Sequence, residues 1–303
     1  MVPQGGTELL MSNLFCHLGS WPQSINLIVS TCDATLLDDQ KKNLVWQHLD
    51  IDQAAAQGAH DPIFQQRVHV WVFVSEWQRT QWLNHFHIDP QKTCVIRNAI
   101  PHSKWCTKPP TTSGLELIYT STPWRGLSVL LDALDLISIT NWRLTVYSSM
   151  IIYGKQFHDT THHQHQALFD RCRQHDQIKY VGYGTNQAVR AALKRSHLFT
   201  YPCTFRETSC LAALEAAQAG CRVVTTSLGA LEESLGAHAR FVPMSHVRTQ
   251  LVQTYAEALA QEMLSYDPCN PSWQKQAEHF DNTYGWHHRL SEWQQLIQHL
   301  LDE

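Results

Sequence analysis

Two glutamates, Glu207 and Glu215, lie eight positions apart in the segment 206–220 and constrain this chain more than any other feature. The residues between them are small, apolar and mostly good helix formers. Residues 198–201 before them predict a buried strand, and residues 221–225 after them predict the next one. The order strand, turn, helix, strand predicts a parallel α/β sheet. Glu207 then lies in the turn at the carboxyl end of a strand, and Glu215 lies about two turns into the helix.

Ligands of open parallel sheets bind beyond the carboxyl ends of the strands, where this turn is expected to lie. Thr208 and Ser209 are candidate N-caps of the helix. The free N–H groups and the positive dipole end of such a helix suit a phosphate. A carboxylate beside that phosphate can accept hydrogen bonds from the hydroxyls of a sugar or a ribose. From the pair alone, a simpler interpretation stays open: Glu207 begins a helix and Glu215 lies on its solvated face.

Composition excludes several classes of protein. The 303 residues suffice for two domains, and 43% hydrophobic with 17% charged residues indicates a globular chain. A net charge of −4 without a long basic run argues against nucleic acid as a partner. No apolar run approaches the roughly 20 residues of a membrane span. Nine dispersed cysteines, with no C-x-x-C pair and no signal-peptide pattern, predict reduced thiols and a cytoplasmic location. Cys203, Cys210 and Cys221 are expected to be small, buried packing residues.

Three further sequence features are expected to face a ligand. Gly5 and Gly6 open a helix, and paired glycines let a ligand approach the backbone closely. His48 lies near the end of a predicted strand at 43–50, on the ligand side of the sheet. Arg125 lies in a glycine-containing turn before an apolar helix, where a guanidinium can meet a phosphate. Each has a simpler alternative: a flexible start of the chain, a structural histidine and a surface arginine.

Strands and helices alternate through both halves of the chain, which predicts two α/β domains with parallel sheets. The other strands are expected at 25–30, 69–75, 94–101, 115–119, 142–147 and 177–181, and the helices at 76–83, 127–137, 186–192, 249–264, 273–280 and 286–301. Ser75 is the expected N-cap of the first of these helices. Prolines between 101 and 110 mark a domain boundary. We therefore expect domains at 1–107 and 108–270, followed by C-terminal helices at 271–303.

Two motifs point weakly to other kinds of site. Gly182 and Gly184 begin a dinucleotide fingerprint, but Gln187 stands where its third glycine should be. His158 and His162 are four positions apart and could hold a metal ion from one helix face. The sequence implies no strong third ligand, so no metal site is predicted.

Six segments form a set: Tyr201-Pro202, Glu207 to Gly220, Val223 to Thr226, Gly229 to Glu232, Val74 to Trp77 and Val95 to Ile100. Together they resemble family-four glycosyltransferases, whose donor domain carries two glutamates at this spacing. The resemblance implies the GT-B architecture, in which two Rossmann-like domains with parallel sheets face a cleft. A final helix that crosses back to the N-terminal domain is also implied. The implied activity is metal-independent transfer of a sugar from a nucleotide-diphosphate sugar to an acceptor, with retention of anomeric configuration and without a cofactor.

The same resemblance implies a role for each site residue. Glu207 would hold hydroxyls of the donor sugar, Glu215 would hold the ribose, and His48 would contact the sugar or the acceptor. Arg125 would meet the diphosphate together with backbone N–H groups, and the backbone near Gly184 would meet the base. The implied catalytic residues are Glu207, His48 and Arg125, and the implied donor-binding residues are Gly6, Arg125, Gly184, Glu207, Thr208, Ser209, Cys210 and Glu215. No protein nucleophile or general base is assigned.

The chain departs from the family pattern in two places. Almost nothing precedes Gly5 and Gly6, so we expect a shortened N-terminal domain without its first strand. Thr120 stands about where the family has a second arginine, which puts part of the charge neutralisation of the diphosphate in doubt. Two alternatives therefore stay open: a non-catalytic subunit that binds a nucleotide or a partner, and a dinucleotide-dependent oxidoreductase. The acceptor is expected to be carbohydrate, lipid-linked or protein, with contacts from a partner protein or from the inner face of a membrane.

Overall fold

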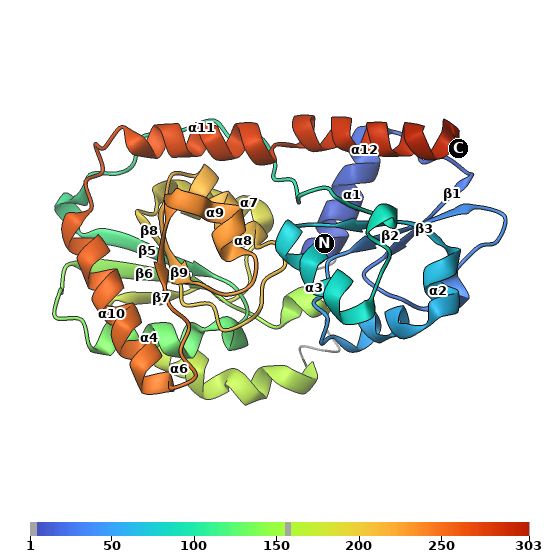
Figure 1. Ribbon diagram of the computed structural model, residues 1–303. Coiled ribbons are helices and arrows are strands. Elements are labelled where there is room, and N and C mark those ends of the chain that lie inside the picture. The colour runs from blue at the N-terminus through green and yellow to red at the C-terminus, as the bar shows by residue number, and fades with distance from the viewer. Residues whose placement is uncertain (1–4, 155–158, 303) are drawn as a thin grey trace.

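A computed structural model describes residues 5–154 and 159–302, and it contains two parallel sheets that lie side by side (Figure 1). The first sheet has the order β1-β2-β3-β4, with β1 (Ile25–Val29), β2 (Lys42–Gln47), β3 (Val68–Phe73) and β4 (Thr93–Val95). The second has the order β10-β9-β8-β5-β6-β7, with β5 (Leu115–Thr120), β6 (Trp142–Tyr147), β7 (Ile178–Tyr180), β8 (Leu198–Tyr201), β9 (Arg222–Thr226) and β10 (Ala239–Val242). All neighbouring strands run parallel, which confirms the predicted α/β class.

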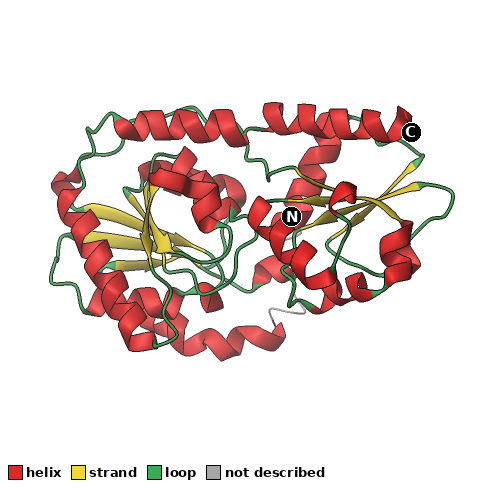
Figure 2. Ribbon diagram, viewed as in Figure 1, coloured by secondary structure: helices red, strands yellow, loops and turns green. Residues whose placement is uncertain are grey.

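Helices surround both sheets, as the red and yellow elements of Figure 2 show. Those of the N-terminal part are α1 (Gly6–Leu18), α2 (Pro62–Arg67) and α3 (Glu76–Phe86). Those that follow are α4 (Leu127–Asp135), α6 (Gln166–Gln174), α7 (Asn186–Arg195), α8 (Leu211–Gln218), α9 (Leu231–Leu235), α10 (Arg248–Ser265), α11 (Ser272–Tyr284) and α12 (Trp286–Asp302). No helix in the ranges 5–154 and 159–302 is both long and apolar enough to cross a membrane.

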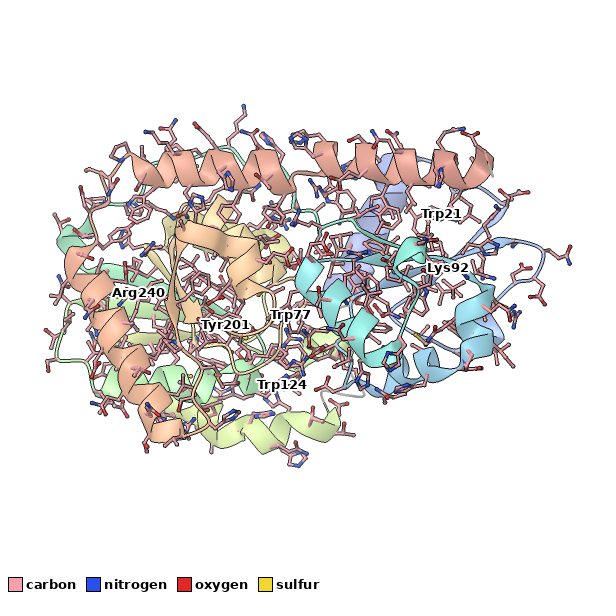
Figure 3. All side chains as sticks on the ribbon, in the orientation of Figure 1. Trp21, Trp77, Lys92, Trp124, Tyr201 and Arg240 are labelled. Atoms are coloured by element: carbon pink, nitrogen blue, oxygen red, sulfur yellow. The ribbon has the colours of Figure 1, made fainter. Side chains whose placement is uncertain are left out.

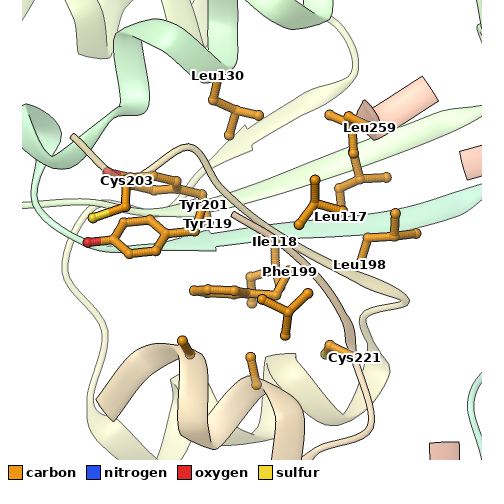
Figure 4. Close-up of a cluster of buried hydrophobic side chains, with 14 of the residues drawn as sticks. Leu117, Ile118, Tyr119, Leu130, Leu198, Phe199, Tyr201, Cys203, Cys221 and Leu259 are labelled. Carbon is orange, nitrogen blue, oxygen red and sulfur yellow. The ribbon is translucent and has the colours of Figure 1, made fainter. Parts of the chain in front are cut away.

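The second sheet has the larger core because its central strands are covered on both faces. All four residues of β8 are buried between β5 and β9, as expected for a central parallel strand. Figure 4 shows Phe199 and Tyr201 of this strand packed among neighbouring strand and helix residues. Cys203, Cys210 and Cys221 are at most 6% exposed, which confirms that they are packing residues. This rigid core fixes the turn that begins at the carboxyl end of β8.

The C-terminal helices connect the two halves of the molecule. In Figure 1, α11 runs beside the second sheet and α12 continues over the first. Trp286, Trp293 and Ile297 of α12 belong to the same buried cluster as residues of α1, β2 and β3. The backbone N–H of Ile100 donates to the carbonyl of Tyr284 at 2.9 Å, where the linker meets the α11–α12 junction. The last helix therefore completes the core of the N-terminal half.

Several predicted elements differ from the observed ones. The predicted strand 43–50 ends at Gln47, and of the predicted strand 94–101 only residues 94 and 95 join the sheet, in β4 (Thr93–Val95). Ser75 caps α3 as expected, because its hydroxyl accepts a hydrogen bond from the Gln78 N–H. In the described residues no strand precedes α1, and β1 forms one edge of the first sheet. The boundaries at 107 and 270 stay predictions.

Candidate functional site

A cavity of about 570 Å³ lies between the two halves of the chain. The carboxyl ends of β2, β5 and β8 lead into its wall, and the N-termini of α1 and α8 open on it. From the N-terminal half it is lined by residues 5–8, Leu10, His48, Leu49, Gln53 and Asn98, and from the second half by residues 120–122, Arg125, 152–154, Phe205 and 207–212. The two halves therefore share one site.

Three side chains form a compact charged group at the carboxyl end of β8. Arg125 Nη1 donates to Glu207 Oε1 at 2.6 Å, and the Tyr201 hydroxyl donates to the same oxygen at 2.6 Å. Glu207 is only 6% exposed. No described residue donates a hydrogen bond to its other oxygen, Oε2. The carboxylate is thus held through one oxygen, while Oε2 stays available to a ligand in the cavity.

Arg125 is held on a second side by an aromatic ring. Its guanidinium carbon lies 4.0 Å from the ring centre of Phe205. Burial lowers the pKa of Arg125, but Glu207 and the other acidic groups around it together outweigh this effect and raise the pKa overall. The guanidinium is therefore a fixed positive charge beside the cavity.

Several buried polar atoms around the cavity have no hydrogen-bond partner among the described residues. They belong to residues that line the cavity, and they are His48 Nε2, Asn98 Oδ1, Thr120 Oγ1, Thr122 Oγ1 and Arg125 Nε. Buried polar atoms are nearly always hydrogen-bonded in folded proteins. A ligand rich in hydroxyl and phosphate oxygens would supply partners of the right kind.

A smaller cavity of about 210 Å³ adjoins the first one and shares Gly5, Gly6 and Thr120 with it. Glu215 lines this second cavity, together with the loop that contains Gly182 and Gly184. A Cβ atom on Gly184 would lie 2.5 Å from the ring of Tyr147, so only glycine fits there.

Glu215 is paired within the second half. Its Oε1 accepts a hydrogen bond from Arg190 Nη1 at 3.2 Å. Burial raises the pKa of Glu215, and the charge of Arg190 partly opposes this rise. The two glutamates thus face adjoining cavities and are held by different arginines.

The expected caps of α8 are wrong. The helix begins at Leu211, and Cys210 is the N-cap without a side-chain hydrogen bond. Thr208 and Ser209 bind the other half of the chain instead. The Thr208 hydroxyl donates to the His48 carbonyl at 2.8 Å, and Asn98 Nδ2 donates to the Ser209 carbonyl at 3.3 Å. Both residues still line the cavity with Cys210.

His48 lies where the sequence suggested, just beyond the end of β2 and in the wall of the cavity. Its Nδ1 lies 3.0 Å from the Ser30 hydroxyl. Burial lowers the pKa of His48 to about 3. The imidazole is therefore neutral near pH 7 and can act there as a hydrogen-bonding group rather than as a cation.

Replacing His48 by glutamine is expected to weaken the pH dependence of stability. Below about pH 6.5 an unfolded histidine binds a proton that folded His48 refuses until about pH 3, so stability falls as the pH drops through this window. Urea unfolding at pH 7 and pH 5 should therefore show a smaller loss of unfolding free energy in His48→Gln than in wild type. The exposed His246→Gln is the control. Equal losses in His48→Gln and wild type would contradict the assignment.

Sequence reasoning missed residues that join the two halves around the cavity. Arg206 Nε lies 2.9 Å from Asp50 Oδ2, and the Asp50 side chain is 2% exposed. Glu233 accepts hydrogen bonds from the N–H groups of Glu76 and Trp77 at the start of α3, at 3.0 and 2.8 Å. These contacts join residues more than 150 positions apart, so no local pattern marks them.

The histidine-rich segment gives no metal centre in the part of the chain that is described. His158 lies outside the described residues. Among residues 5–154 and 159–302, no three His, Cys, Asp or Glu side chains gather closely enough to hold a metal ion.

Comparisons with known proteins agree with this architecture. The sequence profile of the family "Glycosyl transferases group 1" matches residues 116–265, which carry β5 to α10. No curated protein matches the chain.

Three solved structures illustrate the similarity. A glycosyltransferase from Rickettsia africae ESF-5 has 15% identity and a TM-score of 0.65, over 98% of this chain and 80% of that one. A sucrose-phosphate synthase from Thermosynechococcus elongatus has 13% identity and a TM-score of 0.68, over 98% and 79%. The Anabaena protein HepE, solved with UDP and glucose, has 12% identity and a TM-score of 0.66, over 96% and 81%. At such identities the likeness shows the fold, which is the two-domain GT-B architecture. By the profile match, residues 116–265 are similar to the glycosyl transferases group 1 family.

Proposed function

We propose that this protein transfers a sugar from a nucleotide-diphosphate sugar to an acceptor, with retention of anomeric configuration and without a metal ion or other cofactor. One observation carries the proposal. The cavity between the two sheets joins a fixed carboxylate and guanidinium, Glu207 and Arg125, to two helix N-termini and to the smaller cavity beside Glu215. Those are the groups needed to hold a sugar, a diphosphate and a ribose in a row.

The leaving diphosphate would lie against Arg125 and the N-terminus of α8. Positive charge and free N–H groups there would stabilise the negative charge that develops as the sugar departs, an effect typically worth a few kcal/mol for each donor. The Thr120 and Thr122 hydroxyls, buried and unpartnered among the described residues, would add neutral donors where a second cation is missing.

The sugar itself would lie between Glu207 and the N-terminal half. Glu207 Oε2 can accept hydrogen bonds from its hydroxyls, and His48 lines the same cavity from the N-terminal half. We assign no protein nucleophile. The leaving phosphate, held by Arg125, would take up the acceptor proton on the same face of the sugar, which accounts for retention.

The ribose and the base would occupy the smaller cavity. Replacing Glu215 by glutamine is expected to weaken nucleoside diphosphate binding by about 1–3 kcal/mol, because a charged hydrogen-bond acceptor is lost. Titration calorimetry measures the change. Glu262→Gln is the matched control, since Glu262 accepts from Arg222 and its side chain is 17% exposed against 13% for Glu215. Equal affinities of Glu215→Gln and wild type would reject the role.

The similar structures support a UDP-linked sugar as the donor and a carbohydrate as a binding partner. The Anabaena protein was solved with UDP and glucose, and a pneumococcal O-GlcNAc transferase of the same fold was solved with UDP and GlcNAc. For this chain we propose a nucleotide sugar as donor and a carbohydrate, lipid-linked or protein acceptor, with no role for nucleic acid. We place the reaction in the cytoplasm, with acceptor contacts from a partner protein or from the inner face of a membrane.

A non-catalytic nucleotide-binding subunit is the second candidate, because the cavity is poor in positive charge. Among the described residues that line it, Arg125 is the one arginine or lysine, and Glu207 already neutralises it. Such a chain would bind a nucleoside diphosphate and leave the donor intact.

A thermal-shift assay with NADH and with UDP-, GDP- and ADP-sugars separates these functions from a dinucleotide-dependent oxidoreductase. A ligand that binds only the folded state raises the unfolding temperature. At least one nucleotide sugar should raise it, and NADH should not. A rise with NADH alone would overturn the proposed function.

A further inference from the structure

A stacked aromatic pair in the second half has one of its two rings, that of Tyr153, in the wall of the cavity. Trp124 and Tyr153 have ring centres 5.5 Å apart and planes inclined by 21°. Tyr153 lines the cavity and is 43% exposed, while Trp124 is half-buried. Phe205 lines the same cavity. In the view of Figure 3, Trp124 lies in the region where the two halves meet.

The backbone that carries Trp124 is fixed tightly to the end of β8. The Thr204 hydroxyl donates to the Trp124 carbonyl at 2.9 Å. Two residues later, a Cβ atom on Gly126 would come within 2.0 Å of the Pro202 carbonyl oxygen, so the two backbones are in direct contact. Trp124 also directly precedes Arg125, whose guanidinium packs on Phe205. The aromatic pair thus has a set position relative to the group that would hold the leaving diphosphate.

The N-terminal half adds polar groups to the lining of the cavity, beside Leu10 and Leu49. The N-terminal half contributes His48 Nε2 and Asn98 Oδ1, both buried and without a hydrogen-bond partner among the described residues. A ligand in this cavity needs an apolar face for the rings and hydroxyl groups for the polar atoms. A lipid tail would suit only the aromatic rings, and a phosphate would suit only the polar atoms. A sugar ring has both kinds of surface, because its C–H groups form faces and its hydroxyls project from the edge.

We propose that Tyr153, supported from behind by Trp124, forms with Phe205 the platform on which a sugar ring of the acceptor stacks. This inference rests on the proposed function and specifies it, because it makes the acceptor a carbohydrate or a glycan-bearing molecule. Stacking here would bring an acceptor hydroxyl to the cavity shared by Arg125 and Glu207. It would also assign part of acceptor recognition to the second half of the chain.

The test measures glycoside binding while the donor site is filled. The probes are the methyl glycosides of glucose, galactose, mannose and N-acetylglucosamine, followed by saturation-transfer NMR. UDP, GDP or ADP is added at saturating concentration, according to which of the three binds in calorimetry. At least one glycoside should bind wild type. Trp124→Ala and Tyr153→Ala should each weaken its binding about tenfold or more, since ring stacking is lost, whereas Tyr153→Phe should keep it.

Two controls separate stacking from general destabilisation. Tyr266 and Trp273 form a similar stacked pair, with ring centres 5.4 Å apart and planes 11° apart; neither of them lines the cavity, whereas Tyr153 of the first pair does. Trp273→Ala should leave glycoside binding unchanged. Trp124→Ala and Tyr153→Ala should both bind the nucleoside diphosphate as wild type does, because neither ring is assigned to it. Tyr153→Ala removes an exposed ring, so it still tests the platform if Trp124→Ala lowers the stability of the protein.

Failure of this inference is distinct from failure of the proposed function. If wild type binds a nucleoside diphosphate but none of the glycosides, or if a glycoside binds both variants as tightly as wild type, the platform is wrong. If no nucleoside diphosphate binds at all, the proposed function is wrong, and the acceptor platform is overturned with it.

Discussion

Glu207→Ala is expected to lower the rate of sugar transfer by about 100-fold or more while changing nucleoside diphosphate affinity little. The carboxylate is held through Oε1 by Arg125 and Tyr201, which leaves Oε2 for the hydroxyls of the donor sugar. Without it the sugar keeps its nucleotide anchor and loses its orientation. A misplacement of about 1 Å at the reacting centre can cost this much in rate.

The measurement is turnover with the preferred donor, set beside calorimetry with the nucleoside diphosphate. Glu262→Ala is the control, because it removes another carboxylate that is paired with an arginine, and neither member of that pair lines the cavity. If Glu207→Ala folds, binds the donor and transfers sugar at the wild-type rate, Glu207 has no part in the reaction.

Arg125→Ala should weaken nucleoside diphosphate binding by about 10- to 100-fold and leave binding of the nucleoside nearly unchanged. A hydrogen bond to a charged group contributes about 1.5–3 kcal/mol, and the guanidinium is assigned to phosphate rather than to the base. Calorimetry with the diphosphate and with the nucleoside gives both affinities. Equal losses for the two ligands would show that Arg125 only supports the fold.

The same variant is also expected to lower the free energy of unfolding, by about 3–5 kcal/mol, because Glu207 stays buried without its cation. The double variant Arg125→Ala with Glu207→Gln removes that unpaired charge and should recover part of the loss. Chemical denaturation measures the free energy of unfolding of the single and the double variant. Recovery of stability without recovery of diphosphate affinity would separate the structural role of Arg125 from its binding role.

The central unit around Glu207 was predictable because its signals are local. The run 198–201 is mostly apolar, and it forms β8 with the predicted ends. The residues after Cys210 are good helix formers, and they form α8. Because this helix follows β8 directly, both glutamates lie beside the carboxyl edge of the sheet. The position of His48 followed from the same rule for parallel strands.

The contacts made by these residues were not predictable because they depend on distant partners. Arg125 and Glu207 are 82 positions apart, and no periodicity marks the pair. Thr208 has the composition of an N-cap, but its hydroxyl binds the His48 carbonyl 160 positions away. The preference for capping is worth about 1 kcal/mol, and contacts between the two halves outweigh it here. Tyr201 illustrates the same limit, since its sequence position predicts a strand residue and only the structure shows its hydroxyl on Glu207.

The central claim, that the cavity between the two halves activates a nucleotide sugar, is tested most directly by a donor-cleavage screen. Wild type and Glu207→Ala are each incubated with UDP-, GDP- and ADP-sugars, with and without the methyl glycosides, and release of nucleoside diphosphate is measured. The account predicts release from at least one donor by wild type, faster with an acceptor present, and release about 100-fold slower or more in Glu207→Ala. Binding of a nucleoside diphosphate without release from any donor would contradict the claim and leave a nucleotide-binding subunit in its place.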